Sequence, residues 1–354
     1  MIKNKCKKII SICLSMMLAC SLALPVYAEL SDEYESVYEE SDYEPDYEFD
    51  EATGHLIVGK SIESLQNVRF HMEKEEVKSV TIKDGVTKVG DLVFYYLPNL
   101  QEVTIPESVK VIGLEAFYGC ENLQRVNMAN GVQFIYPEAF KGCKNLQEIT
   151  IPNSVTAIGK HAFCECDSLT EITIPDSIRE IGDFAFSGCT SLTSVIIPNS
   201  VTSISEGVFS GCTNLTSINI PISVTSIGDG AFANCRNLQR VTIPESVKGI
   251  GVAAFSFCVK LQEITIPNSV TEIKYGTFSF CVSLASINLP ENINAIGEKA
   301  FCMCESLKQI VIPNSVIEIG DCAFVKTSLT SVTIQKGTNI EENTFDKRVE
   351  IYRK

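Results

Sequence analysis

Cysteine is the residue type whose number and spacing first suggest chemistry in this chain of 354 residues. There are 15 cysteines, and nine of them recur every 23 residues: Cys120, Cys143, Cys166, Cys189, Cys212, Cys235, Cys258, Cys281 and Cys304. Cysteines form disulfides, bind metals or act as nucleophiles. A column of identical positions stacks thiol on thiol, and pairing neighbours would break the period and leave one thiol unpaired. We therefore expect buried free thiols that behave as small apolar side chains.

Two other uses of cysteine are less consistent with the spacing. Tetrahedral metal sites need clusters such as C-x₂₋₄-C, which a 23-residue period does not supply. Cys164, Cys302 and Cys322 lie outside the column and are the candidate reactive thiols. Cys302 and Cys322 fall in adjacent repeats, so they are also the pair that could approach each other.

Catalytic constellations are not recognisable in the sequence. The three histidines are His55, His71 and His161, and no serine or cysteine has a second feature that points to a nearby base. Neither a glycine-rich phosphate loop nor a calcium loop has the required spacing. We predict that the protein is not an enzyme, with no catalytic residue, no metal site and no cofactor.

The elements that position these residues follow from a second column. Phenylalanine recurs eleven times at the same 23-residue interval: Phe94, Phe117, Phe140, Phe163, Phe186, Phe209, Phe232, Phe255, Phe278, Phe301 and Phe324. Such a period indicates a solenoid, in which each repeat buries its apolar face against its neighbours.

One repeat, residues 163–186, reads FCECDSLTEITIPDSIREIGDFAF. The alternation in 172–174 predicts a short strand, which Pro175 ends because proline lacks a backbone donor. A second, shorter extended piece follows, and the Ala-Phe pair is expected in a helical corner. The repeat that starts at Phe117 is degenerate, with Ala129 where proline is usual and Tyr136 in place of glycine.

The pattern L-x-x-I-x-I-P-x-S-V-x-x-I-G-x-x-A-F-x-x-C, as in Leu146 to Cys166, resembles the BspA-like class of bacterial leucine-rich repeats over roughly residues 77–345. The resemblance implies a β-rich, right-handed, curved array with two short strands and a helical or 3-10 corner per 23-residue unit. It also implies a surface or secreted role, often in adhesion, and offers no catalytic residues to transfer.

The chain divides into five expected parts. Residues 1–28 resemble a signal peptide, with lysines before an apolar run and a small-residue cleavage site at 26–28. Residues 29–51 form an acidic arm, 52–79 an N-terminal cap, 80–345 a solenoid of about 12 rungs and 346–354 a C-terminal cap strand. A membrane anchor or a lipoprotein with Cys20 lipidated are the alternatives for the first part. We expect a secreted or cell-surface protein without a membrane span.

The arm holds 12 carboxylates and five aromatic residues without lysine or arginine. Like charges and little aliphatic content predict disorder. The arm is either a solvated spacer or an acidic segment that attracts a basic partner. The formal charge of the chain is −15, and no basic stripe is present, which disfavours nucleic acid as a partner.

Outward positions of the first strand form two parallel columns, which we take as the candidate binding face. The residues selected from these columns are Glu102, Arg125, Glu148, Glu171, Thr150, Thr173, Arg240 and Glu263. A flat polar face of this kind suits a protein partner, such as a host matrix protein or a surface protein of a neighbouring cell.

A candidate apolar patch is formed by Phe257, Phe280 and Met303, which occupy a position where several repeats have glycine. Local packing explains such a stripe, and contact with a partner or a second copy is the alternative. Two functions follow: adhesin-like protein binding through the strand face, or a structural role in which the solenoid assembles with itself. The sequence does not fix the oligomeric state.

Overall fold

The computed structural model describes residues 46–63 and 74–354. The expected signal peptide and residues 29–45 of the expected acidic arm lie outside the described residues. The solenoid forms one compact unit from Pro45 onward, and its description below concerns that unit alone.

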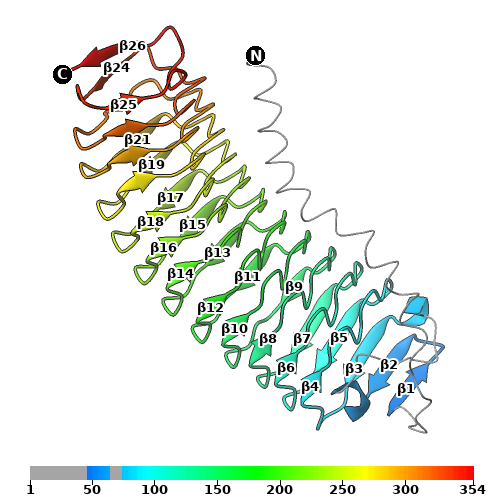
Figure 1. Cartoon of the computed structure of the whole chain (residues 1–354). Helices are drawn as coiled ribbons and strands as arrows, with labels where there is room; N and C mark the ends of the chain where they lie inside the picture. Colours follow the sequence, from blue (N-terminus) through cyan, green and yellow to red (C-terminus); the bar gives the residue numbers. More distant parts are fainter. Residues whose placement is uncertain (1–45, 64–73) are drawn as a thin grey trace, which may run out of the picture. The chain divides into compact units, whose positions relative to one another are not determined.

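Two ladders of short parallel strands run along this unit, one on each side of the rungs (Figure 1), and breaks in the hydrogen bonding divide each ladder into three sheets. The first ladder contains β2 (His55–Val58), β3 (Ser79–Ile82), β5 (Glu102–Ile105), β7 (Arg125–Met128), β9 (Glu148–Ile149), β11 (Glu171–Thr173), β13 (Ser194–Ile196), β15 (Ser217–Asn219), β17 (Arg240–Thr242), β19 (Glu263–Thr265), β21 (Ser286–Asn288), β24 (Ser331–Ile334) and β26 (Glu350–Arg353).

The second ladder contains β4 (Lys88–Val89), β6 (Val111–Ile112), β8 (Phe134–Ile135), β10 (Ala157–Ile158), β12 (Glu180–Ile181), β14 (Ser203–Ile204), β16 (Ser226–Ile227), β18 (Gly249–Ile250), β20 (Glu272–Ile273), β22 (Ala295–Ile296), β23 (Glu318–Ile319) and β25 (Asn339–Ile340). Paired residues are 23 apart through most of both ladders, as in Ser194, Ser217 and Arg240. The parallel β-solenoid predicted from the 23-residue period is confirmed.

Stacked phenylalanine rings fill the core between the ladders. Rings from Phe94 to Phe324 are fully buried, and consecutive centroids lie 5.1 to 5.8 Å apart in nearly parallel planes. The spacing is close to the roughly 4.8 Å between paired strands, so each ring lies in contact with the rings of both neighbouring rungs. The phenylalanine column therefore acts as the main core filler, as predicted.

The corner that carries each phenylalanine is a run of three overlapping β-turns and not the helical or 3-10 corner that was expected. Phe184 and Gly188 both have positive φ, 56° and 75°. Only the turn hydrogen bonds remain within the rung, such as that from the Ser187 N–H to the Phe184 carbonyl at 3.0 Å. The N–H of Phe186 donates instead to Val208 of the next rung at 3.0 Å. Alternation between the right- and left-handed regions prevents a helix from propagating. Within the described residues, 3-10 helix occurs only at η2 (Lys60–Glu63) and η3 (Lys74–Glu76).

Strand β1 (Tyr47–Asp50) corrects the expected extent of the acidic arm, 29–51. It pairs antiparallel with β2, and Tyr47 and Phe49 pack against the core. The Lys83 ammonium pairs with Asp46 at 3.3 Å and with Glu48 at 3.0 Å. This local cation offsets the repulsion between carboxylates, so the end of the acidic segment forms a strand.

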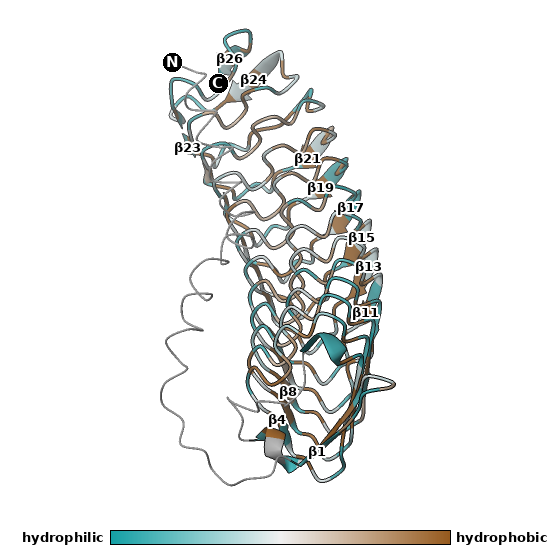
Figure 2. Ribbon diagram, turned by 90° about the vertical axis from the view of Figure 1, so that its right-hand side faces the viewer, coloured by the Kyte–Doolittle hydropathy of each residue, from teal (hydrophilic) through white to brown (hydrophobic). Residues whose placement is uncertain are grey.

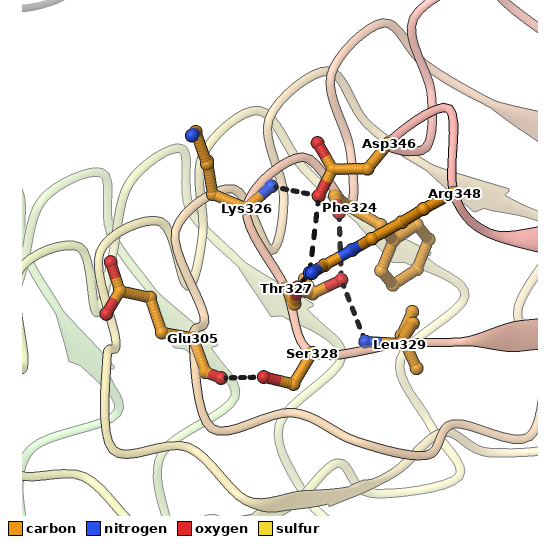
Figure 3. Close-up of polar contacts among 8 residues, drawn as sticks. All are labelled: Glu305, Phe324, Lys326, Thr327, Ser328, Leu329, Asp346 and Arg348. Carbon is orange, nitrogen blue, oxygen red and sulfur yellow. Dashed lines mark hydrogen bonds and ion pairs between the residues drawn. The ribbon is translucent and has the colours of Figure 1, made fainter.

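The last repeats are shorter and depart from the pattern. Thr327 takes the position of the repeat cysteine, and its hydroxyl donates to the Phe324 carbonyl at 3.0 Å (Figure 3). Asp346 accepts from the Lys326 N–H at 3.1 Å and lies 3.8 Å from the Arg348 guanidinium. These polar contacts hold the loop that carries Phe345 against the rung before it. Phe345 stacks on Phe324 at 5.1 Å although only 21 residues separate them.

Candidate functional site

The candidate binding face lies on the outside of the first ladder, whose strands β11 to β21 follow one another along one side of Figure 2. Alternation along each strand places one side chain inward and the next outward. In β11, Ile172 is 6% exposed, whereas Glu171 and Thr173 on either side of it are exposed.

All eight residues predicted for this face are on the first ladder or directly beside it. Glu102 is half-buried, and the seven others are exposed: Arg125, Glu148, Thr150, Glu171, Thr173, Arg240 and Glu263. The register places Arg125 between Glu102 and Glu148, and it places Arg240 beside Glu263. The structure therefore brings the predicted residues into two groups along the ladder.

The charges on this face are unevenly neutralised. Arg125 lies 3.9 Å from Glu102, whose same carboxylate oxygen also accepts a hydrogen bond from Asn127 at 2.7 Å. Glu148 and Glu171 occupy equivalent positions in consecutive rungs, and neither forms an ion pair with any residue between 46–63 or 74–354. These two carboxylates are free to meet a cation on a partner.

Two large aliphatic side chains interrupt the polar face. Ile196 is 72% exposed and Val311 is 78% exposed, in the column that otherwise holds threonine and asparagine. Single exposed apolar residues are common on protein surfaces. Here they lie far apart along the ladder, so they add isolated apolar contacts and not a continuous patch.

The nine column cysteines are buried, as predicted, and each also makes a hydrogen bond that the sequence did not reveal. Each thiol donates to the carbonyl of the phenylalanine in the preceding rung, at 3.0 to 3.4 Å. Burial raises the pKa of Cys120, Cys189 and Cys281 to about 12. Such thiols stay protonated at neutral pH and are poor nucleophiles and metal ligands.

Cys164, Cys302 and Cys322, the off-column cysteines of the described residues, do not have the environment of reactive thiols. Cys164 is fully buried and Cys302 is 8% exposed. Cys322 is half-buried, and its thiol lies 3.3 Å from the Asp321 carboxylate. Burial and this carboxylate raise the pKa of Cys322 to about 12. Reactive cysteines need a lowered pKa, so the suggestion of reactivity is not supported.

The predicted apolar patch combines stacking with an unusual backbone. Phe257 and Phe280 stack with centroids 4.3 Å apart, and all three patch residues are half-buried. Phe257, Phe280 and Met303 have φ of 59°, 61° and 65°, in the region that favours glycine. A bulky residue in this conformation costs about 1 kcal/mol or more. Other non-glycine residues at this position, such as Glu165 and Asn234, also have positive φ, so the conformation belongs to the repeat and not to the patch alone.

A cationic and aromatic cluster at the N-terminal corner was not predicted. Lys141 is 9% exposed, pairs with Glu138 at 2.8 Å and lies 5.3 Å from the centre of the Tyr118 ring. Burial raises the pKa of Tyr118 to about 12, and burial together with Lys141 lowers the pKa of His161. Lys141 occupies a position that is often serine, so the sequence alone gave no sign of its burial.

Within the described residues, no group of three or more His, Cys, Asp or Glu side chains is arranged to hold a metal ion. No helix in that same part of the chain is long and apolar enough to cross a membrane.

The two parallel ladders, the 23-residue register and the inward phenylalanine and leucine columns define a leucine-rich repeat solenoid. More specifically, the chain belongs to the family described as BspA type leucine-rich repeat region (6 copies), whose model matches residues 47–163, 133–251 and 225–351.

Solved structures of bacterial leucine-rich repeat proteins are similar to this chain. One from Bacteroides ovatus ATCC 8483 shares 26% identity, with 90% of this chain and 100% of that chain covered and a TM-score of 0.55. One from Eubacterium ventriosum ATCC 27560 shares 23% identity, with 84% and 90% covered and a TM-score of 0.59. A leucine-rich cell surface protein from Faecalibacterium prausnitzii A2-165 shares 27% identity, with 87% and 86% covered and a TM-score of 0.47. The comparison with curated proteins gave no match.

Proposed function

We propose that the protein is an exported, non-enzymatic binding protein that recognises another protein through the outer face of the first ladder. The observation that carries the proposal is the pair of unpaired carboxylates, Glu148 and Glu171, beside exposed Thr150 and Thr173. Flat arrays of outward side chains on solenoids commonly serve as binding surfaces. Unpaired carboxylates on such a face favour a partner with a basic patch.

An adhesin-like role at the cell surface, or after secretion, is the setting that we propose. It is supported by the membership of the BspA-type family and by the signal-peptide pattern of residues 1–28. The proposed partners are host matrix proteins or surface proteins of neighbouring cells. Nucleic acid is not proposed as a partner because the chain is acidic and its strand face carries more carboxylates than cations.

The proposal is tested by site-directed photo-crosslinking. A photoreactive amino acid at Thr173 reports on the first ladder, and the same amino acid at Glu180 on β12 is the matched control, since both sites are exposed. The labelled proteins are incubated with purified host matrix proteins and with neighbouring cells. We expect a crosslinked product from position 173 only. Equal products from both positions, or a product from 180 alone, would remove this face from the proposal.

Self-assembly through the apolar patch is a second candidate function. It is supported by Phe257, Phe280 and Met303, which place large apolar side chains, all half-buried, in three consecutive rungs. Light scattering of wild type and of a Phe257→Asn, Phe280→Gly variant tests it, because both substituted residue types occur at this position in other rungs. A multimer that dissociates in the variant supports assembly. A wild-type monomer at all concentrations argues against it.

A further inference from the structure

Four large apolar side chains gather on the outside of the N-terminal rungs, around β8 and the adjoining corner. Leu92 is 41% exposed, Leu114 37%, Phe134 40% and Tyr136 43%. Phe134 and Tyr136 flank Ile135, which is 1% exposed, so both point outward. The Leu92 N–H donates to the Leu114 carbonyl at 2.9 Å, which places those two in neighbouring rungs. We call these four residues the β8 patch.

The repeat does not require these residues. Positions equivalent to Phe134 hold Glu180, Ser203, Ser226 and Glu272, and positions equivalent to Leu114 hold Lys160, Asp183, Glu206 and Asp229. Tyr136 occupies a column that is mostly glycine. A Cβ on Gly182 of that column would come within 2.5 Å of the Lys160 nitrogen. Tyrosine is thus placed where the packing of the repeat favours the smallest residue.

The residues beside Phe134 on the two neighbouring strands have smaller side chains than its ring. Val111 on β6 and Ala157 on β10 are its partners in the ladder, and both are only half-buried. Small side chains on both sides leave the ring accessible. The exposed apolar groups therefore extend over three strands and the corner beside them, which distinguishes the β8 patch from the isolated Ile196 and Val311.

Two lysines without an ion-pair partner border the β8 patch. Lys110 and Lys160 are exposed, and neither forms an ion pair within the described ranges, although the Lys110 ammonium donates to the Glu107 carbonyl at 3.0 Å. Two of the nearby carboxylates are already neutralised: Asp91 pairs with Lys88 at 3.3 Å, and Glu138 pairs with Lys141. Two further carboxylates, Glu115 and Asp183, are half-buried and form no ion pair within the described ranges. Two lysines that are not neutralised by a carboxylate therefore lie beside an apolar surface, in a chain with a formal charge of −15.

We propose that the β8 patch is a second interaction surface, which binds a protein segment that carries apolar anchors flanked by carboxylates. Apolar anchors bury against Leu92, Leu114 and the two rings, and carboxylates pair with Lys110 and Lys160. The aliphatic side chains favour a protein over a sugar, because sugars stack on ring faces and need hydrogen-bonding groups. A second copy in a twofold arrangement would bring the unpaired lysines of both copies to one interface, which like-charge repulsion disfavours.

The test uses residues that the repeat already accepts at these positions. The variant Leu114→Lys, Phe134→Ser, Tyr136→Gly copies Lys160, Ser226 and Gly159. Ile196→Thr, Val311→Thr is the control, because it removes exposed apolar groups elsewhere. The probe is a phage-displayed library of random peptides, selected on the wild-type protein after depletion on the triple variant. Enriched sequences are then synthesised for titration.

We expect enriched peptides to combine aromatic or leucine residues with Asp or Glu. They should bind the triple variant about tenfold more weakly or worse, and the control variant as well as wild type. Lys110→Glu, Lys160→Glu should also weaken binding and reverse its salt dependence, because salt then screens a repulsion between carboxylates. Tyr136→Gly alone should cause part of the loss and should unfold cooperatively, which separates lost contacts from misfolding.

Three results would overturn the proposal. One is no enrichment, or peptides that bind the triple variant as tightly as wild type. Another is selected peptides that lack carboxylates and ignore the lysine substitutions. The third is a wild-type dimer in light scattering that becomes a monomer in the triple variant, since a second copy would then be the occupant. None of these results depends on the first-ladder face, so the two proposals fail separately.

Discussion

The thiol of Cys189 donates to the backbone carbonyl of Phe163, one rung earlier, with 3.2 Å between Sγ and oxygen. The same bond recurs in each rung from Cys120 to Cys304. The cysteine column is therefore a ladder of weak donors that partner buried carbonyls, and not a store of reactive groups. This relationship explains why the position is cysteine: the side chain is small, apolar and still able to donate.

The first prediction concerns the accessibility of these thiols. In the native protein, a maleimide should leave the nine column cysteines unlabelled, because all are buried. Cys322, which is half-buried, should be labelled before them. Mass spectrometry of labelled peptides, with and without denaturant, measures this. Rapid native labelling of the column, or disulfides between neighbouring rungs, would contradict the buried ladder.

A pH dependence follows from the raised pKa of the thiols. Burial raises the pKa of Cys120, Cys189 and Cys281 from 9.0 to about 12, so the folded chain holds protons that the unfolded chain releases between these values. This contribution to stability is fully present below pH 9 and is lost as pH rises towards 12. Urea unfolding from about pH 7 to about pH 11 should show the decline.

The control for this pH dependence is a Cys189→Ala, Cys281→Ala variant. It should be less stable than wild type at neutral pH because it loses two buried hydrogen bonds. The difference in the free energy of unfolding between wild type and variant should narrow as the pH rises, since the variant has two fewer thiols to deprotonate. A gap that stays constant would show that the thiols do not cause the decline.

The phenylalanine stack predicts unequal costs of truncation along the solenoid. Phe209→Ala removes a fully buried ring with neighbours at 5.7 and 5.8 Å, and should destabilise folding by about 3–5 kcal/mol. Phe345 is 8% exposed and stacks on Phe324, its one ring partner in the described chain, so Phe345→Ala should cost less. Denaturant unfolding of both variants provides the measurement. Equal losses would argue against the stack as the main core element.

Hydrogen exchange tests the strand at the end of the acidic segment. Residues 47–50 should exchange slowly because β1 pairs with β2. Lys83→Ala should speed their exchange, since it removes the cation that pairs with Asp46 and Glu48. Lys78→Ala, an exposed lysine outside these ion pairs, serves as the control. The disorder expected for residues 29–45 remains a prediction, and slow exchange there at neutral pH would contradict it.

Much of the fold could be predicted from residue spacing alone. Phenylalanine, cysteine and the alternating strand positions each keep a 23-residue offset, which specifies the stacking and the buried face. The corner was predicted wrongly because an Ala-Phe pair has helical propensity. Its conformation is determined instead by hydrogen bonds to the next rung, such as Phe186 to Val208. The helix propensity of a short segment does not take such contacts with another rung into account.

The surface could be predicted less completely. Outward strand positions follow from alternation, so the exposure of Glu148 and Glu171 could be predicted from the sequence, while their role in binding stays a prediction. The β8 patch was missed, because its residues lie in different columns of three repeats and meet only when those repeats stack. Tyr136 in a glycine column was the one signal that could have indicated it. Strand β1 was not predicted, because the high net negative charge of residues 29–51 indicated disorder. That charge does not reveal the local ion pair between Glu48 and Lys83.

The central claim is that the outer face of the first ladder binds a protein partner. The most direct measurement is the dissociation constant of the crosslinked partner for a Glu148→Lys, Glu171→Lys variant, at low and at high salt. The control is Glu180→Lys, Glu318→Lys, which makes the same change in charge on the second ladder. We predict binding weakened about tenfold or more by the first variant at low salt, with a smaller difference at high salt and no change in the control. Equal affinity of both variants and wild type at both salt concentrations would contradict the claim.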